Sequence, residues 1–112
     1  MAVKLIKKKD VKFEFKKGRE YYYLYMGDIV YLISEGRKIK LVTLKGTYEY
    51  YGRLEDALNN LNKNFVLIHQ SYVINKEHVL RYAYKDVEMA DGTILSISPA
   101  KRKYVRRNIL GE

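Results

Sequence analysis

Phe65-Val66-Leu67-Ile68-His69-Gln70-Ser71-Tyr72-Val73-Ile74-Asn75 is the stretch of this sequence on which the fold depends. Apolar runs at its two ends flank three polar residues. Because β-branched and aromatic residues favour a half-buried pleated surface, the pattern predicts strand, exposed turn, strand. The polar residues are either an ordinary connection or a group held in place to contact a ligand.

Five segments before this stretch have the composition of strands, and turn residues separate them. They span residues 11–16, 20–26, 29–33, 38–44 and 47–51. The segment 29–33 is apolar throughout, which indicates a central strand. Leu54, Ala57, Leu58 and Leu61 then follow at helical spacing, and they predict an amphipathic helix of about two turns.

Three more short strands are expected after the stretch, over residues 78–82, 85–89 and 93–97, with a hairpin turn at Asp91-Gly92. Ser98-Pro99 then predicts the start of a helix over 100–110, with the serine as cap and the proline in the first position. Tyr104, Val105 and Ile109 are its apolar points. Its basic N-terminal end is either a site for a phosphate or a solvated surface.

The number and spacing of these elements predict a mainly β domain, either a sandwich or barrel-like, rather than an α/β fold. The chain has no repeat, no low-complexity tract and no linker-like composition. With 112 residues it is long enough for one core. We therefore expect a single domain over residues 11–112, preceded by a basic lead-in over residues 1–10.

Charge is the main compositional clue to function. Lys and Arg number 22 against 13 Asp and Glu, which gives a net charge of +9. Such an excess on a small domain points to a polyanion, or else only keeps the surface soluble. Cysteine is absent, and no apolar run approaches the roughly 18 residues of a membrane span. We expect a cytoplasmic protein.

An enzyme is not expected from the motifs. His69 and His78 are the two histidines, and they belong to no cluster with metal-ligand spacing. No phosphate-binding glycine loop or nucleophile elbow is present. His69 and Ser71 share a face, but no acid lies near to orient the histidine, so a structural histidine is the better interpretation. We expect no cofactor, no metal and no small-molecule substrate.

Four residues at predicted loop tips and at the helix start could contact nucleic acid. Arg37 can pair with a guanine or a phosphate, and Gln70 can pair bidentately with adenine. Ser98 and Lys101 open the basic helix. All four could share one edge of a sandwich.

Two ordered sets of residues resemble the core of LytTR-type DNA-binding domains. The first is Phe65-x-x-Ile68-His69-Gln70-Ser71-Tyr72-x-Ile74-Asn75, followed by Val79 and by Val87-x-Met89-x-Asp91-Gly92-x-x-Leu95-x-Ile97-Ser98. The second lies upstream and comprises Asp28-Ile29-Val30-Tyr31-Leu32-x-Ser34-Glu35 and Leu54-x-x-Ala57-Leu58. Each piece alone is loose, but their order is fairly specific and covers residues 11–110.

The resemblance implies an elongated sandwich of short antiparallel sheets, with about ten strands and two short helices. It also implies a bacterial transcription regulator, the output domain of a response regulator in a two-component system. Such a domain reads direct repeats in successive major grooves from loops and bends the DNA. Two copies would then lie side by side on double-stranded DNA. Members usually carry a receiver or membrane segment, so this chain would be a free-standing member or an excised domain.

Carried over by position, the contact residues implied by the resemblance are Arg37, Gln70 and Ser98, with Lys38, Pro99 and Lys101 beside them. The family commonly has an arginine at or after the position of Ser98. Here either Lys101 or Arg102 takes that role, or the contact is lost.

Two other functions remain open on the sequence. One is a domain that binds RNA or single strands non-specifically, through its charge and tyrosines, or that binds another protein. The other is docking of the basic tail, residues 1–9, on an anionic membrane. Our expectation is DNA binding without a membrane partner.

Overall fold

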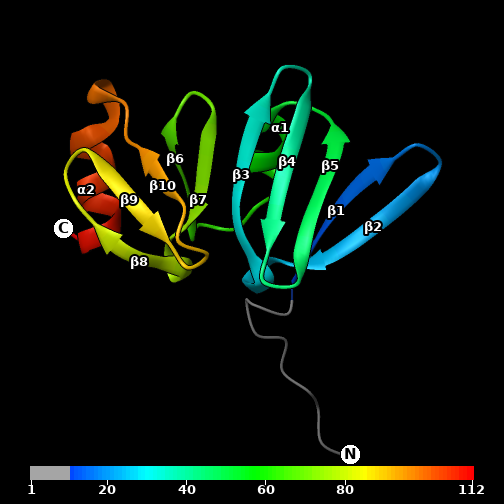
Figure 1. The fold of residues 1–112 in the computed structure, drawn as a ribbon, viewed down its shortest axis with the longest axis horizontal. Coiled ribbons are helices and arrows are strands. Elements are labelled where there is room, and N and C mark those ends of the chain that lie inside the picture. Colours follow the sequence, from blue (N-terminus) through cyan, green and yellow to red (C-terminus); the bar gives the residue numbers. More distant parts are fainter. Residues whose placement is uncertain (1–10) are drawn as a thin grey trace, which may run out of the picture.

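The computed structural model describes residues 11–112, so the predicted lead-in over 1–10 lies outside the described residues. Ten strands and two α-helices follow one another along this part of the chain (Figure 1). The strands are β1 (Lys12–Lys17), β2 (Glu20–Tyr25), β3 (Ile29–Glu35), β4 (Lys38–Thr43), β5 (Gly46–Tyr51), β6 (Phe65–His69), β7 (Tyr72–Asn75), β8 (Val79–Tyr82), β9 (Asp86–Met89) and β10 (Ile94–Ser96). The helices are α1 (Leu54–Asn59) and α2 (Arg102–Leu110), and 3-10 turns cover η2 (Met26–Asp28), η3 (Lys76–His78) and η4 (Pro99–Lys101).

All strand pairs are antiparallel, and they form three sheets. A five-stranded sheet has the order β5-β4-β3-β7-β6; β1 pairs with β2, and β10-β9-β8 make the third sheet. The stretch from Phe65 to Asn75 forms the β6–β7 hairpin, and residues 29–33 lie in the middle strand, as predicted. The domain measures 46 × 38 × 24 Å, and the elongated mainly β fold is confirmed.

The central sheet is buried on both faces, which explains why residues 29–33 are apolar without alternation. On one face, Leu32 and Val73 pack with Phe13 and Phe15 of β1 and with Leu54 of α1. A bulge between Ile29 and Tyr31 shifts the register of β3 against β4. Through these contacts of Phe13, Phe15 and Leu54, the β1–β2 hairpin and α1 together cover this face.

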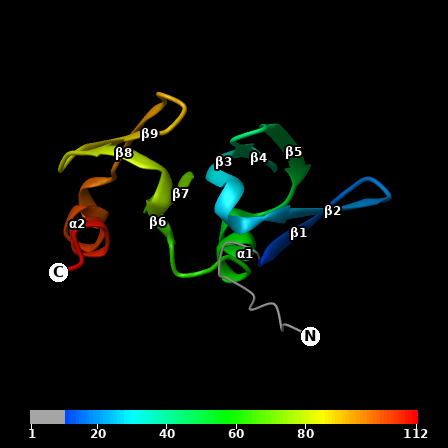
Figure 2. The same cartoon turned by 90° about the horizontal axis from the view of Figure 1, so that it is seen from below.

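The other face of the central sheet packs against the C-terminal third of the chain. Ile68 and Ile74 meet Val87 and Leu95 of the three-stranded sheet and Val105 of α2, and all five are almost fully buried. Figure 2 shows α2 and α1 well apart, with β6 and β7 between them. This packing fixes the start of α2 relative to β6.

The predicted C-terminal helix differs from the structure at its start. A 3-10 turn precedes α2, and Pro99 occupies its first turn as predicted, but the Ser98 side chain makes no capping hydrogen bond. Val105 is buried, whereas Tyr104 is 53% exposed and is not a core residue. Neither helix of residues 11–112 has the length and apolar character that a bilayer crossing requires.

Candidate nucleic-acid interface

Three connections lie along one edge of the molecule, the upper edge in Figure 1. They are the two-residue turn Gly36-Arg37 between β3 and β4, the two-residue turn Gln70-Ser71 between β6 and β7, and the segment 98–101 that leads into α2. The sheet order places these turns together because β3 pairs with β7. We call this side of the molecule the reading edge.

Backbone hydrogen bonds hold the connections of the reading edge to one another. The N–H of Ser34 donates to the carbonyl of Ser71 at 2.9 Å, which joins the end of β3 to the β6–β7 turn. The N–H of Ser98 donates to the carbonyl of Ile68 at 2.9 Å, and that of Gly52 donates to the carbonyl of Arg37 at 3.1 Å. These bonds do not depend on the exposed side chains, so truncation of the Arg37 or Gln70 side chain leaves the frame intact.

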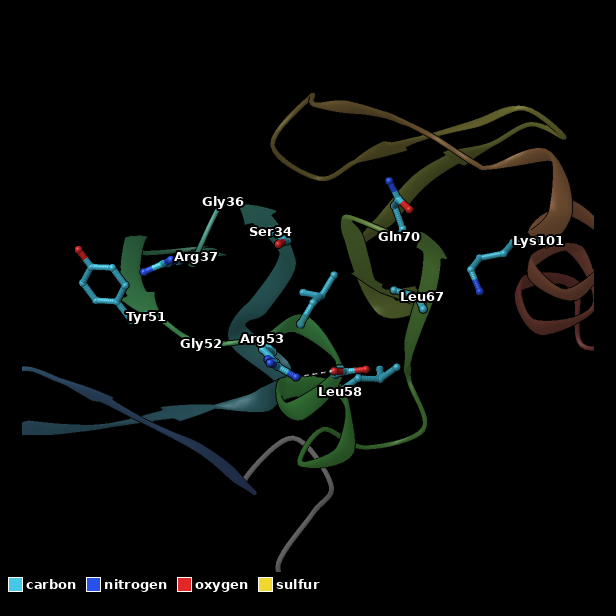
Figure 3. A pocket seen from close by; sticks show the side chains of 12 residues that line it. Ser34, Gly36, Arg37, Tyr51, Gly52, Arg53, Leu58, Leu67, Gln70 and Lys101 are labelled. Atoms are coloured by element: carbon cyan, nitrogen blue, oxygen red, sulfur yellow. Dashed lines mark ion pairs between the residues drawn. The ribbon is translucent and has the colours of Figure 1, made fainter.

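A pocket of about 810 Å³ opens at the reading edge (Figure 3). It brings together three of the predicted contact residues, Arg37, Gln70 and Lys101, from three separate segments. The rest of its lining is Ser34, Gly36, Tyr51, Gly52, Arg53, Leu54, Glu55, Leu58 and Leu67. The guanidinium, the amide and the ammonium thus surround one concave surface with an apolar floor.

The turn that carries Arg37 depends on a glycine. Gly36 has φ +63°, a conformation that L-residues rarely adopt, and it occupies the first central position of a two-residue hairpin turn. Arg37 follows in this turn and is exposed. Gln70 is likewise exposed in its turn. Both side chains are free to reach a ligand in solvent.

Lys38, Ser98 and Arg102 do not line this pocket. Lys38 faces a second cavity, and Ser98 is half-buried between β10 and η4. The guanidinium of Arg102 lies 5.8 Å from the centre of the Tyr84 ring, and its Nε is shielded from solvent. Arg102 therefore packs on the domain instead of joining Arg37 and Gln70.

The second cavity, of about 430 Å³, lies beside the first and is called the hairpin cavity here. It is lined by Lys16, Lys17, Gly18, Lys38, Glu49, Tyr50 and Tyr51. The Lys38 ammonium lies 5.3 Å from the centre of the Tyr51 ring. Burial raises the pKa of Tyr50 to about 12, so its phenol stays neutral beside these lysines.

The histidine next to Gln70 has a structural role. Nδ1 of His69 accepts a 3.1 Å hydrogen bond from the N–H of Ser71, and the His69 ring stacks on Tyr72 with centroids 4.6 Å apart. The Ser71 backbone, not its hydroxyl, makes this contact. His69 therefore braces the turn that presents Gln70, as a hydrogen-bonded structural histidine would.

Several residues of the reading edge were not expected from the sequence. Tyr51 and Arg53 line the pocket from the end of β5 and the connection to α1. Arg53 is 78% exposed and lies 3.6 Å from the Glu55 carboxylate. The β4–β5 turn lies at 44–45 and not at 45–46, where the predicted segments put it, and the observed register sets Tyr51 opposite Lys38.

Comparison with known proteins agrees with this architecture. Residues 19–109 match the family model of the LytTr DNA-binding domain. No curated protein sequence matches the chain. Among solved structures, the chain is similar to the LytTr DNA-binding domain of a protein described as a methyl-accepting/DNA response regulator from Bacillus cereus, with TM-score 0.74, 18% identity, and coverage of 91% of this chain and 98% of that one. Because the family model spans most of the chain, this protein belongs to the LytTR family of DNA-binding domains.

Proposed function

We propose that this domain regulates bacterial transcription by binding double-stranded DNA sequence-specifically, reading direct repeats in the major groove through its loop residues. The observation that carries the proposal is the pocket at which Arg37, Gln70 and Lys101 meet. A guanidinium can pair bidentately with guanine and a carboxamide with adenine, whereas an ammonium neutralises phosphate without reading sequence.

The roles follow from the position of each side chain. Arg37 and Gln70 lie on short turns that backbone hydrogen bonds hold in place. Their side chains can therefore enter a groove of the duplex and contact base edges. Lys101 lies at the start of the C-terminal helix and is assigned to a phosphate. Lys38, Ser98 and Arg102 flank this group and are assigned to the DNA backbone.

Direct repeats would place two copies side by side in the same orientation. The 46 Å length of one domain corresponds to about 13 base pairs at 3.4 Å each, more than one helical turn. Each copy would thus cover its own repeat. Because bacterial DNA is cytoplasmic, the proposal places the protein there.

The test is selection of duplexes from a random library, followed by fluorescence anisotropy over a salt series. The selected duplex should bind at least about 1,000-fold more tightly than its scrambled version at 0.15 M salt, with a shallower salt slope. Recovered sequences should contain a repeated element. Equal and steeply salt-dependent binding to both duplexes would contradict base reading.

One observation favours a second candidate, binding of single-stranded nucleic acid. Tyr21, Tyr23 and Tyr25 lie on one face of β2 and are 58%, 57% and 46% exposed. Exposed aromatic rings can stack on unpaired bases. A single-stranded oligonucleotide that competes with the selected duplex at equal concentration would support this candidate, and failure to compete would exclude it.

A further inference from the structure

We infer that the DNA interface continues past the reading edge onto the β1–β2 hairpin, where Lys16, Lys17 and Lys38 hold a backbone phosphate of the flanking duplex. This inference rests on the proposed function and extends it, since it assigns a ligand to the hairpin cavity. The expected ligand is the phosphodiester backbone, which carries no base information.

The hairpin cavity shares a lining residue with the pocket at the reading edge. Tyr51 lines both cavities, and Lys38 follows Arg37 directly in the sequence, so the two residues leave the β3–β4 turn toward different cavities. Any duplex seated against Arg37 therefore passes the mouth of the hairpin cavity.

The charge of the hairpin cavity fits an anion. Three lysines line it against one carboxylate, that of Glu49, which also stands opposite Lys40 in the β4–β5 pairing. The ammonium of Lys16 lies 5.7 Å from the centre of the Tyr21 ring. An aromatic face attracts a cation without neutralising it, so Lys16 keeps its charge for a phosphate.

The position of the hairpin fits a flanking contact. The β1–β2 hairpin lies at the end of the long axis opposite α2, and its turn, residues 18–19, points away from the central sheet (Figure 1). Over the 46 Å length, a duplex placed along the reading edge advances by more than one helical turn. The backbone thus comes within reach of the hairpin outside the base pairs that the turns read.

The test compares the double variant Lys16→Ala/Lys17→Ala with the charge-matched control Lys45→Ala/Lys63→Ala. Lys45 belongs to the β4–β5 turn at the edge opposite the reading edge (Figure 1), and all four lysines are exposed. Circular dichroism melts of both variants verify folding. Anisotropy is then measured over a salt series with the selected duplex, its scrambled version, and a selected duplex shortened on the hairpin side.

The hairpin variant should lower the salt slope by about 1, because loss of the one phosphate contact removes about 0.9. Its affinity should fall about tenfold on the selected and the scrambled duplex alike, so the ratio between them stays constant. The shortened duplex should bind the wild type and the hairpin variant equally, and the control should keep the wild-type slope.

The inference would be overturned if the hairpin variant kept the wild-type salt slope. It would also be overturned if the variant lost its preference for the selected over the scrambled duplex instead of losing affinity for both. Its failure is distinct from failure of the proposed function. If the wild type discriminates between duplexes but the hairpin variant keeps its slope, only the hairpin contact is wrong. If the wild type does not discriminate, sequence reading fails, and the slope on the scrambled duplex still decides the hairpin contact.

Discussion

The hydroxyl of Tyr31 donates a 2.9 Å hydrogen bond to Oδ2 of Asp91, which joins the middle of the central sheet to the β9–β10 turn. The N–H of Thr93 donates to Oδ1 of the same carboxylate at 3.0 Å. Burial raises the pKa of Asp91, but hydrogen bonds from Thr93 and Tyr31 outweigh burial and leave this pKa below its usual value. The turn is therefore fastened by an ionised carboxylate.

Tyr31→Phe should lower the free energy of unfolding by about 1 kcal/mol at pH 7. The pKa of Asp91 is lower in the folded state than in the unfolded state. The ionised carboxylate therefore stabilises the fold fully above pH of about 4, and this stabilisation is lost as pH falls through the pKa of Asp91 in the folded state. Urea unfolding at pH 7 and pH 2.5 should show the difference from wild type shrinking in acid. Tyr104→Phe, at an exposed tyrosine, serves as control. A difference independent of pH would contradict the role of Asp91.

Tyr50→Phe should make the domain more resistant to alkali. Burial raises the pKa of Tyr50 to about 12 in the folded state, whereas an unfolded tyrosine has a pKa near 10. The neutral phenol therefore contributes its full stabilisation below pH 10, and this stabilisation is lost as pH rises from 10 to 12. Solvent screening at the partly exposed phenol makes the effect smaller than the roughly 3 kcal/mol to which two pKa units correspond. Unfolding of wild type and variant should diverge over this range in pH-jump denaturation. Parallel curves would show that Tyr50 ionises freely.

Gly36→Ala should cost about 1 kcal/mol and weaken DNA binding. The cost arises from backbone strain, because alanine rarely adopts a φ of +63°. It does not arise from a steric clash, because an added Cβ meets nothing within 4 Å. Arg37 follows in the same turn, so relaxation of the turn displaces its side chain. Asparagine tolerates this conformation better, and Gly36→Asn should retain most of the affinity measured by anisotropy. Equal loss in both variants would mean that the turn does not depend on this φ.

Asn75→Ala should lower the free energy of unfolding by about 2 to 4 kcal/mol. The side chain is 1% exposed, its amide donates to the carbonyl of Ile29 at 2.9 Å, and its oxygen accepts from the N–H of Glu77 at 3.0 Å. Removal leaves buried backbone groups without partners. Asn60→Ala, at an exposed amide, should cost less than about 0.5 kcal/mol in the same urea titration.

Arg37→Ala should weaken binding to the selected duplex by about 1 to 3 kcal/mol and to the scrambled duplex by much less. The matched control is Arg81→Ala, because Arg81 already pairs with Asp86 at 2.9 Å and Glu88 at 3.3 Å. The pKa of Arg81 is raised by its hydrogen bonds to these two carboxylates. Equal losses on both duplexes for Arg37→Ala would reduce Arg37 to a phosphate contact.

Local patterns in the sequence predicted most of the strands. Alternation and turn residues located the β1–β2 and β4–β5 hairpins, and the apolar run 29–33 located the middle strand, because burial on both faces removes alternation. Composition could not reveal which strands pair across the chain. The pairing of β3 with β7 depends on packing among distant segments, and that pairing brings Arg37 and Gln70 to one edge.

The candidate site was predicted only in part, for a related reason. Arg37 and Gln70 were predicted as contact residues from their types at predicted turns, and Lys101 from its place at the predicted helix start; the structure places all three around one pocket. Arg102 has the same chemistry as Arg37, and no local pattern shows that it packs on Tyr84. Nor does a local pattern show that the Asn75 side chain joins the start of β3 to η3 through hydrogen bonds with Ile29 and Glu77.

The two-residue length of the turns that carry Arg37 and Gln70 has an evolutionary consequence. Their backbones are fixed by the paired strands on either side, and their side chains contribute nothing to the core. Under the proposed function, a change at Arg37 or Gln70 would therefore alter the preferred DNA sequence without a cost in folding. Regulators descended from one ancestor would then acquire separate target genes by exchanging these two side chains while the scaffold beneath stays the same.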